Sequence, residues 1–155
     1  MTSHEQERVL QAIAAHRARP GPLLEVLHAV QDALGCVPDD AVPLIAAQLN
    51  LSRAEVHGVR SFYHHFRATP PGRHVLRVCR AEACQAVHCE ATEARAKQRL
   101  GVESGGTTDD GAFTLEAVYC LGNCAAGPSV MVDEQLYGRM TPERLDTLID
   151  SWRKR

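Results

Sequence analysis

The sequence predicts an α+β protein, in which an N-terminal helical region precedes a small sheet with helices packed against it. Three observations support this fold class. Apolar residues recur at helical spacing in the first part of the chain, the stretch at residues 69–72 (TPPG) interrupts that pattern, and beyond it the residues alternate as they do in strands. The later segments run in the order strand, helix, strand, strand, strand, helix, which is typical of an α+β domain.

Two helices are expected before residue 36. The first begins at Ser3, which forms a capping-box pattern with Gln6, and it ends before the breaker residues 20–22. The second begins near Pro22 and should end at Gly35, because glycine readily adopts the left-handed backbone of a helix C-cap. Its apolar positions form one stripe, made of Leu23, Leu27, Val30 and Leu34.

Two shorter helices should follow, one over residues 42–49 and one that opens at Ser52. Glu55, three residues after Ser52, completes a second capping-box pattern. Pro70 and Pro71 then lack backbone N–H donors, so the helical pattern cannot continue through them. The sequence therefore predicts two domains, an N-terminal helical bundle at residues 1–70 and a second domain at residues 71–155.

The second domain should contain strands joined to two helices. A strand over residues 74–79 leads into one helix over residues 82–100, and the next strand places Phe113 through Tyr119 with alternate residues on one face. Residues 129–132 and 135–137 form two further strands, joined by a short turn. The last helix has Thr141 as its cap and Pro142 at its first position.

Four cysteines have the spacing of metal ligands. Cys79 and Cys84 form a C-x4-C pair, and Cys120 and Cys124 form a C-x3-C pair. All four fall near predicted strand ends, where neighbouring loops can converge on one site. Thiolate is a soft ligand that suits an iron–sulfur cluster or a structural zinc, and both spacings are compatible with zinc. The C-x4-C pair favours iron slightly, because plant-type ferredoxins use it.

Other uses of the cysteines fit the sequence less well. A disulfide framework is disfavoured in a reducing cytoplasm, and thiol exchange usually employs C-x-x-C, which is absent. Cys36 is expected to be a small buried apolar residue. Cys89 should face away from Cys84, because five positions along one helix turn a side chain by roughly 140°. The four histidines of interest are not assigned to the metal site; they are His57, His64, His65 and His88.

Composition and motif searches exclude several functions. The net charge of -2 and the pI of about 6.4 give no basic surface for nucleic acid. No apolar stretch approaches the length of a membrane span, and no secretory signal is evident, so a cytoplasmic protein is expected. The sequence lacks nucleotide-binding glycine motifs and a nucleophile elbow. No catalytic residue is predicted, and a carrier without a substrate site must pass electrons to partner proteins.

Four segments resemble one known family. They are residues 34–38 (LGCVP), 49–66 (LNLSRAEVHGVRSFYHHF), 79–86 (CRAEACQA) and 120–128 (CLGNCAAGP). Together they resemble the thioredoxin-like 2Fe-2S ferredoxins, which include the small subunit of respiratory NADH dehydrogenase. The resemblance implies a thioredoxin-like domain and one 2Fe-2S cluster, held by Cys79, Cys84, Cys120 and Cys124. The family often has an aromatic residue where this chain has Cys36.

Within that family, residues 78–86 (VCRAEACQA) look most like the gamma subunits of soluble NAD-dependent formate dehydrogenases. This resemblance implies a non-catalytic subunit of an NAD-dependent oxidoreductase. Its partners would be a flavin subunit that binds NAD and a molybdenum-containing subunit that oxidises formate. NADH:quinone oxidoreductases and NAD-reducing hydrogenases use similar subunits and remain alternatives. A zinc-stabilised interaction module is the alternative from a different class of protein.

Overall fold

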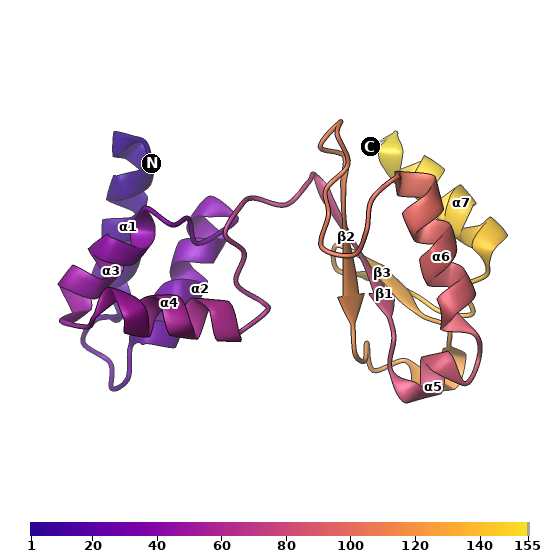
Figure 1. Ribbon diagram of the computed structural model, residues 1–155, viewed down its shortest axis with the longest axis horizontal. Coiled ribbons are helices and arrows are strands. Elements are labelled where there is room, and N and C mark those ends of the chain that lie inside the picture. The colour runs from indigo at the N-terminus through magenta and orange to yellow at the C-terminus, as the bar shows by residue number, and fades with distance from the viewer. Residues whose placement is uncertain (155) are drawn as a thin grey trace. The chain divides into compact units, whose positions relative to one another are not determined.

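The computed structural model describes residues 1–154, and Arg155, the last residue of the predicted second domain, lies outside the described residues. The chain forms two compact units, Met1–Pro70 and the residues from Pro71 onward. Each unit has its own hydrophobic core. Helices and a four-stranded mixed sheet confirm the α+β fold class (Figure 1).

The first unit consists of helices around a core of aliphatic side chains. The buried side chain of Gln31 connects α2 (Leu23–Leu34) to the segment that follows α4 (Arg53–Phe62). Its amide donates to the His65 carbonyl at 2.8 Å and accepts from the Arg67 N–H at 2.8 Å. Buried Arg60 likewise donates to the Val37 carbonyl at 3.0 Å. The helices are α1 (Ser3–His16), α2 (Leu23–Leu34), α3 (Ala41–Leu49) and α4 (Arg53–Phe62).

The helix ends follow from local chemistry. The capping box of Ser52 and Glu55 is confirmed, with Ser52 Oγ accepting from the Glu55 N–H at 3.1 Å. Gly35 ends α2 at φ 78°, as predicted. The first capping box lies one residue earlier than predicted, because Thr2, not Ser3, caps α1 and pairs with Glu5. Both threonine and serine can cap a helix, so adjacent candidates are hard to separate by sequence.

The second unit is a sheet of strand order β2-β1-β3-β4. Strand β1 runs parallel to β2 and antiparallel to β3, and β3 pairs antiparallel with β4. Helices α6 and α7 lie side by side (Figure 1) and share one core with β1, β2 and β3. The elements are β1 (His74–Cys79), α5 (Glu82–Gln85), α6 (Cys89–Leu100), β2 (Phe113–Val118), η1 (Cys124–Ala126), β3 (Val130–Val132), β4 (Gln135–Tyr137) and α7 (Pro142–Arg153).

Strand pairing brings the loops that carry the cysteines to one end of the sheet. Because β1 and β2 are parallel and in register up to the pair Cys79 and Val118, the loops that leave both strands begin at the same edge. The antiparallel strand β3 starts at that edge too, with Val130 opposite Val78. The Cys79 N–H donates to the Ser129 carbonyl at 3.0 Å, which fixes the end of β1 beside the start of β3.

Two expectations about this unit were wrong. The predicted helix over residues 82–100 is two helices, α5 and α6, separated by His88 in the left-handed region at φ 63°. A non-glycine residue there interrupts the helix and resets its direction. Strand β2 ends at Val118, and Tyr119, expected to share one face of this strand with Phe113, is 74% exposed whereas Phe113 is fully buried. Within residues 1–154, none of the helices has the length and apolar character needed to cross a membrane.

Candidate metal centre

Two segments at one edge of the sheet, one after β1 and one after β2, carry the four predicted ligands. Cys79 is the last residue of β1, and Cys84 lies in the short helix α5 that follows it. Cys120 lies two residues beyond the end of β2, and Cys124 is the first residue of η1. The structure therefore places all four cysteines at or just beyond strand ends, as the sequence indicated.

The exposed pair has the spacing that one metal ion requires. The sulfur atoms of Cys120 and Cys124 lie 3.8 Å apart, and both side chains reach the surface. Two thiolates bound at about 2.3 Å to one tetrahedral metal would lie about 3.8 Å apart. The Gly122 N–H donates to the Cys120 sulfur at 3.3 Å, and Gly122 adopts φ 74°, a conformation that favours glycine.

The second pair is buried. Cys79 is 1% exposed and Cys84 is 2% exposed, and they pack together in a pocket that Ala81, Val118 and Leu121 help to close. Burial, with a hydrogen bond to the Cys79 thiol as the next cause, raises the pKa of the Cys84 thiol to about 11. In the exposed pair, a hydrogen bond with Cys120 raises the pKa of the Cys124 thiol.

These pKa shifts couple metal binding to proton release. Without a cation nearby, the low dielectric around Cys84 disfavours its thiolate, so its proton is retained at neutral pH. Metal ligation needs the thiolate and must displace that proton. Cys84 can thus offer its sulfur to a positive metal ion and stays neutral otherwise.

Gly127 lies close to both pairs. A Cβ atom added there would lie 3.5 Å from the Cys84 sulfur and 3.7 Å from the Cys124 carbonyl oxygen. The nearest atom would be Val87 Cγ2 at 3.1 Å, so a side chain at this position would crowd Val87 beside the Cys84 sulfur. Among residues 1–154, no three His, Cys, Asp or Glu side chains gather in the arrangement that a single metal ion needs. The predicted ligands come as two pairs, and a soft centre with two metal ions fits that donor set.

Cys89 packs with Cys84, although the sequence predicted that it would face away. The expectation that it turns away from Cys84 assumed one continuous helix, and the break at His88 invalidates that assumption. Cys89 is 2% exposed and packs with Cys79 and Cys84 in the same pocket. The left-handed His88 was the missed feature, and no glycine or asparagine at that position signalled it.

The remaining residues of interest belong to the first unit or, for His88, to the turn before α6. Cys36 is buried in the first unit, as expected, and its burial raises the pKa of the thiol. His57, His64 and His65 also belong to the first unit. His88 is exposed and contacts Glu90. We assign none of these histidines to the metal site.

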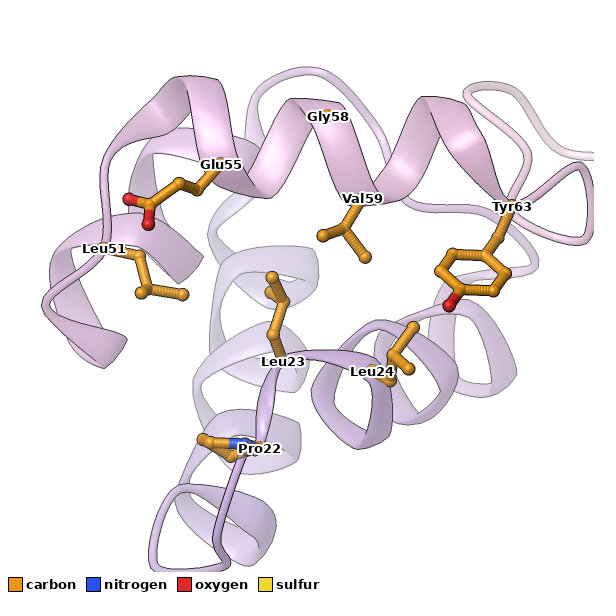
Figure 2. A pocket seen from close by; sticks show the side chains of 9 residues that line it. Pro22, Leu23, Leu24, Leu51, Glu55, Gly58, Val59 and Tyr63 are labelled. Carbon is orange, nitrogen blue, oxygen red and sulfur yellow. The ribbon is translucent and has the colours of Figure 1, made fainter.

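The first unit has an apolar groove of about 540 Å³ between the start of α2 and one face of α4 (Figure 2). Leu23, Leu24, Val59 and Tyr63 line it. The carboxylate of Glu55 also borders the groove, but it already accepts hydrogen bonds at the α4 cap. No thiol lines the groove, so it contributes no ligand to the cysteine site.

The fold and the thiol chemistry define the class of protein. It is a sheet protein whose loops at strand ends present cysteine thiols for a soft metal centre. The family match is more specific. The chain belongs to the Thioredoxin-like [2Fe-2S] ferredoxin family, which it matches over residues 9–153. Its cofactor is accordingly a 2Fe-2S cluster, and its general role is electron transfer.

Curated relatives cover nearly the whole chain. The E subunit of the NADH-quinone oxidoreductase of Escherichia coli (strain K12) is 33% identical over 153 residues, which are 99% of this chain and 92% of the relative. The corresponding protein of Pseudomonas aeruginosa is 37% identical over 129 residues, 83% of this chain and 78% of the relative. The NADP-reducing hydrogenase subunit HndA of Solidesulfovibrio fructosivorans is 33% identical over 141 residues, 91% of this chain and 82% of that subunit.

A solved structure shares the fold. The crystal structure of an NAD+-reducing [NiFe]-hydrogenase in the air-oxidized state superposes with a TM-score of 0.71 and 23% sequence identity. The match covers 89% of this chain and 24% of the hydrogenase chain, so this chain spans about a quarter of that protein. At this identity the likeness concerns the fold alone.

Proposed function

We propose that the chain carries its 2Fe-2S cluster on Cys79, Cys84, Cys120 and Cys124, with each cysteine pair bound to one iron. The observation that carries this assignment is the 3.8 Å separation of the Cys120 and Cys124 sulfurs, which suits two ligands of one tetrahedral metal ion. When bound, such a cluster accepts and releases single electrons at a potential that its surroundings set.

The protein's own residues would serve this role in two ways. The sheet holds the buried pair in place, since the Cys79 N–H donates a hydrogen bond to the carbonyl of Ser129, the residue before β3. The exposed pair leaves one edge of the site accessible to another protein, and the Gly122 N–H stabilises negative charge on the Cys120 sulfur. The chain has the parts of an electron carrier, and we assign no substrate chemistry to it.

We further propose that it works in a soluble, cytoplasmic NAD-dependent formate dehydrogenase. In this proposal it exchanges electrons with a flavin subunit that binds NAD, and a molybdenum-containing subunit oxidises formate. The resemblance of residues 78–86 (VCRAEACQA) to gamma subunits of such enzymes supports the assignment. The second candidate is the equivalent subunit of an NADH:quinone oxidoreductase or an NAD-reducing hydrogenase, which the curated relatives favour.

Metal analysis tests the cofactor assignment. Protein purified without oxygen should contain about two irons and two sulfides per chain, and dithionite should generate an electron paramagnetic resonance signal of a reduced 2Fe-2S cluster. A protein with one zinc and neither iron nor sulfide would instead be the zinc-stabilised interaction module.

Co-purification tests the choice of complex. An affinity-tagged chain isolated from its native host should bring a flavin subunit and a molybdenum subunit, and the preparation should reduce NAD when formate is added. Reduction driven by hydrogen, or NADH oxidation coupled to quinone, would assign the chain to the second candidate and contradict the formate proposal. The cluster assignment would be unaffected by either result.

A further inference from the structure

A third buried thiol shares the pocket of the proposed buried ligands. Cys89 is 2% exposed, and its packing partners in this pocket include Cys79 and Cys84. The apolar side chains that pack against these three thiols are Ala81, Val118 and Leu121.

The fold holds Cys89 in this place. It is the first residue of α6, directly after the left-handed residue His88. It also begins the buried face of that helix, which continues with Thr92, Ala96 and Leu100 at helical spacing. Ala96 and Leu100 belong to the core shared with the sheet. Rotating Cys89 out of the pocket would therefore require α6 to leave the sheet.

The thiol chemistry gives Cys89 a role that packing alone would not. A protonated thiol is a weak hydrogen-bond donor, and a metal-bound thiolate is an acceptor. Hydrogen bonds to ligand sulfurs favour the more negative, reduced state of a cluster and tune its potential. Cys79 and Cys84, the proposed buried ligands, pack in one cluster with Cys89.

We propose that Cys89 is a positioning residue of the cluster site, a non-ligand whose S–H donates to a sulfur of the buried ligand pair and raises the cluster's reduction potential. The inference rests on the proposed ligand assignment, because it needs a metal-bound thiolate as the acceptor. It adds a residue that the four-cysteine pattern does not contain.

Three substitutions separate a donor role from a packing role. Cys89→Ala and Cys89→Val remove the donor, with less and with similar side-chain volume, whereas Cys89→Ser keeps a donor. All three should retain the iron and sulfide content of the unchanged protein. In redox titrations followed by electron paramagnetic resonance, Cys89→Ala and Cys89→Val should have more negative midpoint potentials, and Cys89→Ser should titrate at or above the unchanged protein. Cys36→Ala, a thiol of the other unit, is the control and should have no effect.

Several results would overturn the inference. Unchanged potentials in both Cys89→Ala and Cys89→Val would show that Cys89 only fills space. Loss of iron from Cys89→Ser would show that it is a ligand. A more negative potential in Cys89→Ser, like that of the apolar variants, would contradict the donor role. If the unchanged protein lacks iron, the proposed function itself fails, and that result is visible before any variant is made.

Discussion

Single sulfur atoms decide whether the proposed site holds its cluster. We expect that Cys79→Ser, Cys84→Ser, Cys120→Ser and Cys124→Ser each lose most of the iron and the visible absorption, because a hydroxyl is a harder ligand than a thiolate. Iron and sulfide assays on protein purified without oxygen measure this. Cys36→Ser is the matched control, since that thiol lies in the helical unit. Normal spectra in all four variants would refute the ligand assignment.

Gly138 allows the loop of the exposed pair to pack closely. A Cβ atom there would lie 2.6 Å from the Ala126 carbonyl oxygen and 2.6 Å from Asn123 Nδ2. Ala126 belongs to η1, which begins at Cys124. Gly138→Ala should therefore destabilise the protein by roughly 1–3 kcal/mol, the usual cost of overpacking, and reduce cluster content.

Gly58→Ala provides the comparison for Gly138→Ala. Gly58 lies inside α4, and nothing lies within 4 Å of an added Cβ. Alanine favours a helix interior by about 0.5–1 kcal/mol over glycine, so this variant should be slightly more stable. Thermal unfolding of both variants measures the contrast. Equal effects of the two substitutions would mean that the contacts of Gly138 are unimportant.

Helices α6 and α7 are joined by ion pairs whose strength depends on pH. Arg95 donates to both carboxylate oxygens of Asp146, with its Nη2 2.6 Å from Oδ2. This hydrogen bonding, aided by charge, lowers the pKa of the Asp146 carboxyl. A carboxyl whose folded pKa is lowered stabilises the protein above its unfolded pKa, about 3.9, and that contribution is lost as pH falls through the folded value.

Asp146→Asn should therefore be slightly less stable than the unchanged protein at pH 7. The difference should shrink as pH falls below about 4, and it should vanish once Asp146 is protonated. Denaturant unfolding at a series of pH values measures this difference. A constant difference across that range would show that the carboxylate charge does not contribute.

Sequence patterns predicted most elements because their ends carry strong local chemistry. Ser52 with Glu55, Gly35, and Thr141 with Pro142 all end or begin helices as expected. The break between α5 and α6 was missed because His88 adopts a backbone that its residue type seldom takes. Because that break was missed, Cys89 was expected to face away from Cys84, whereas it packs in one cluster with Cys84.

For the site, the sequence indicated the four thiols and their approach at strand ends. It could not indicate that Cys79 and Cys84 are buried while Cys120 and Cys124 are exposed, because burial depends on how separate loops cover one another. The family resemblance, confirmed by the match over residues 9–153, supplied the cofactor that spacing alone left open.

At the level of the whole chain, we propose that residues 1–70 and 71–155 are separate domains. The cluster should stabilise the second domain, since its proposed ligands come from two segments of that unit, one after β1 and one after β2. Trp152 is the single tryptophan and lies in the second unit, so its fluorescence reports on that unit.

Removing the metal with a chelator should lower the thermal midpoint reported by Trp152 by several degrees. A loss of about 1 kcal/mol shifts the midpoint of a domain of 60–100 residues by roughly 4–8 °C. Reconstitution with iron and sulfide should restore it. An unchanged midpoint after complete iron loss would show that the second domain folds independently of its cofactor.

The unequal burial of the two thiol pairs has a practical consequence for handling the protein. Dissolved oxygen and peroxide reach sulfur atoms at the surface first, and thiolates there oxidise to sulfenic and sulfinic acids. Damage in air should therefore begin at Cys120 and Cys124, while Cys79 and Cys84 remain chemically intact beneath the protein. Aged samples would then carry added oxygen on one peptide and not on the other, a pattern that mass spectrometry of a digest can record.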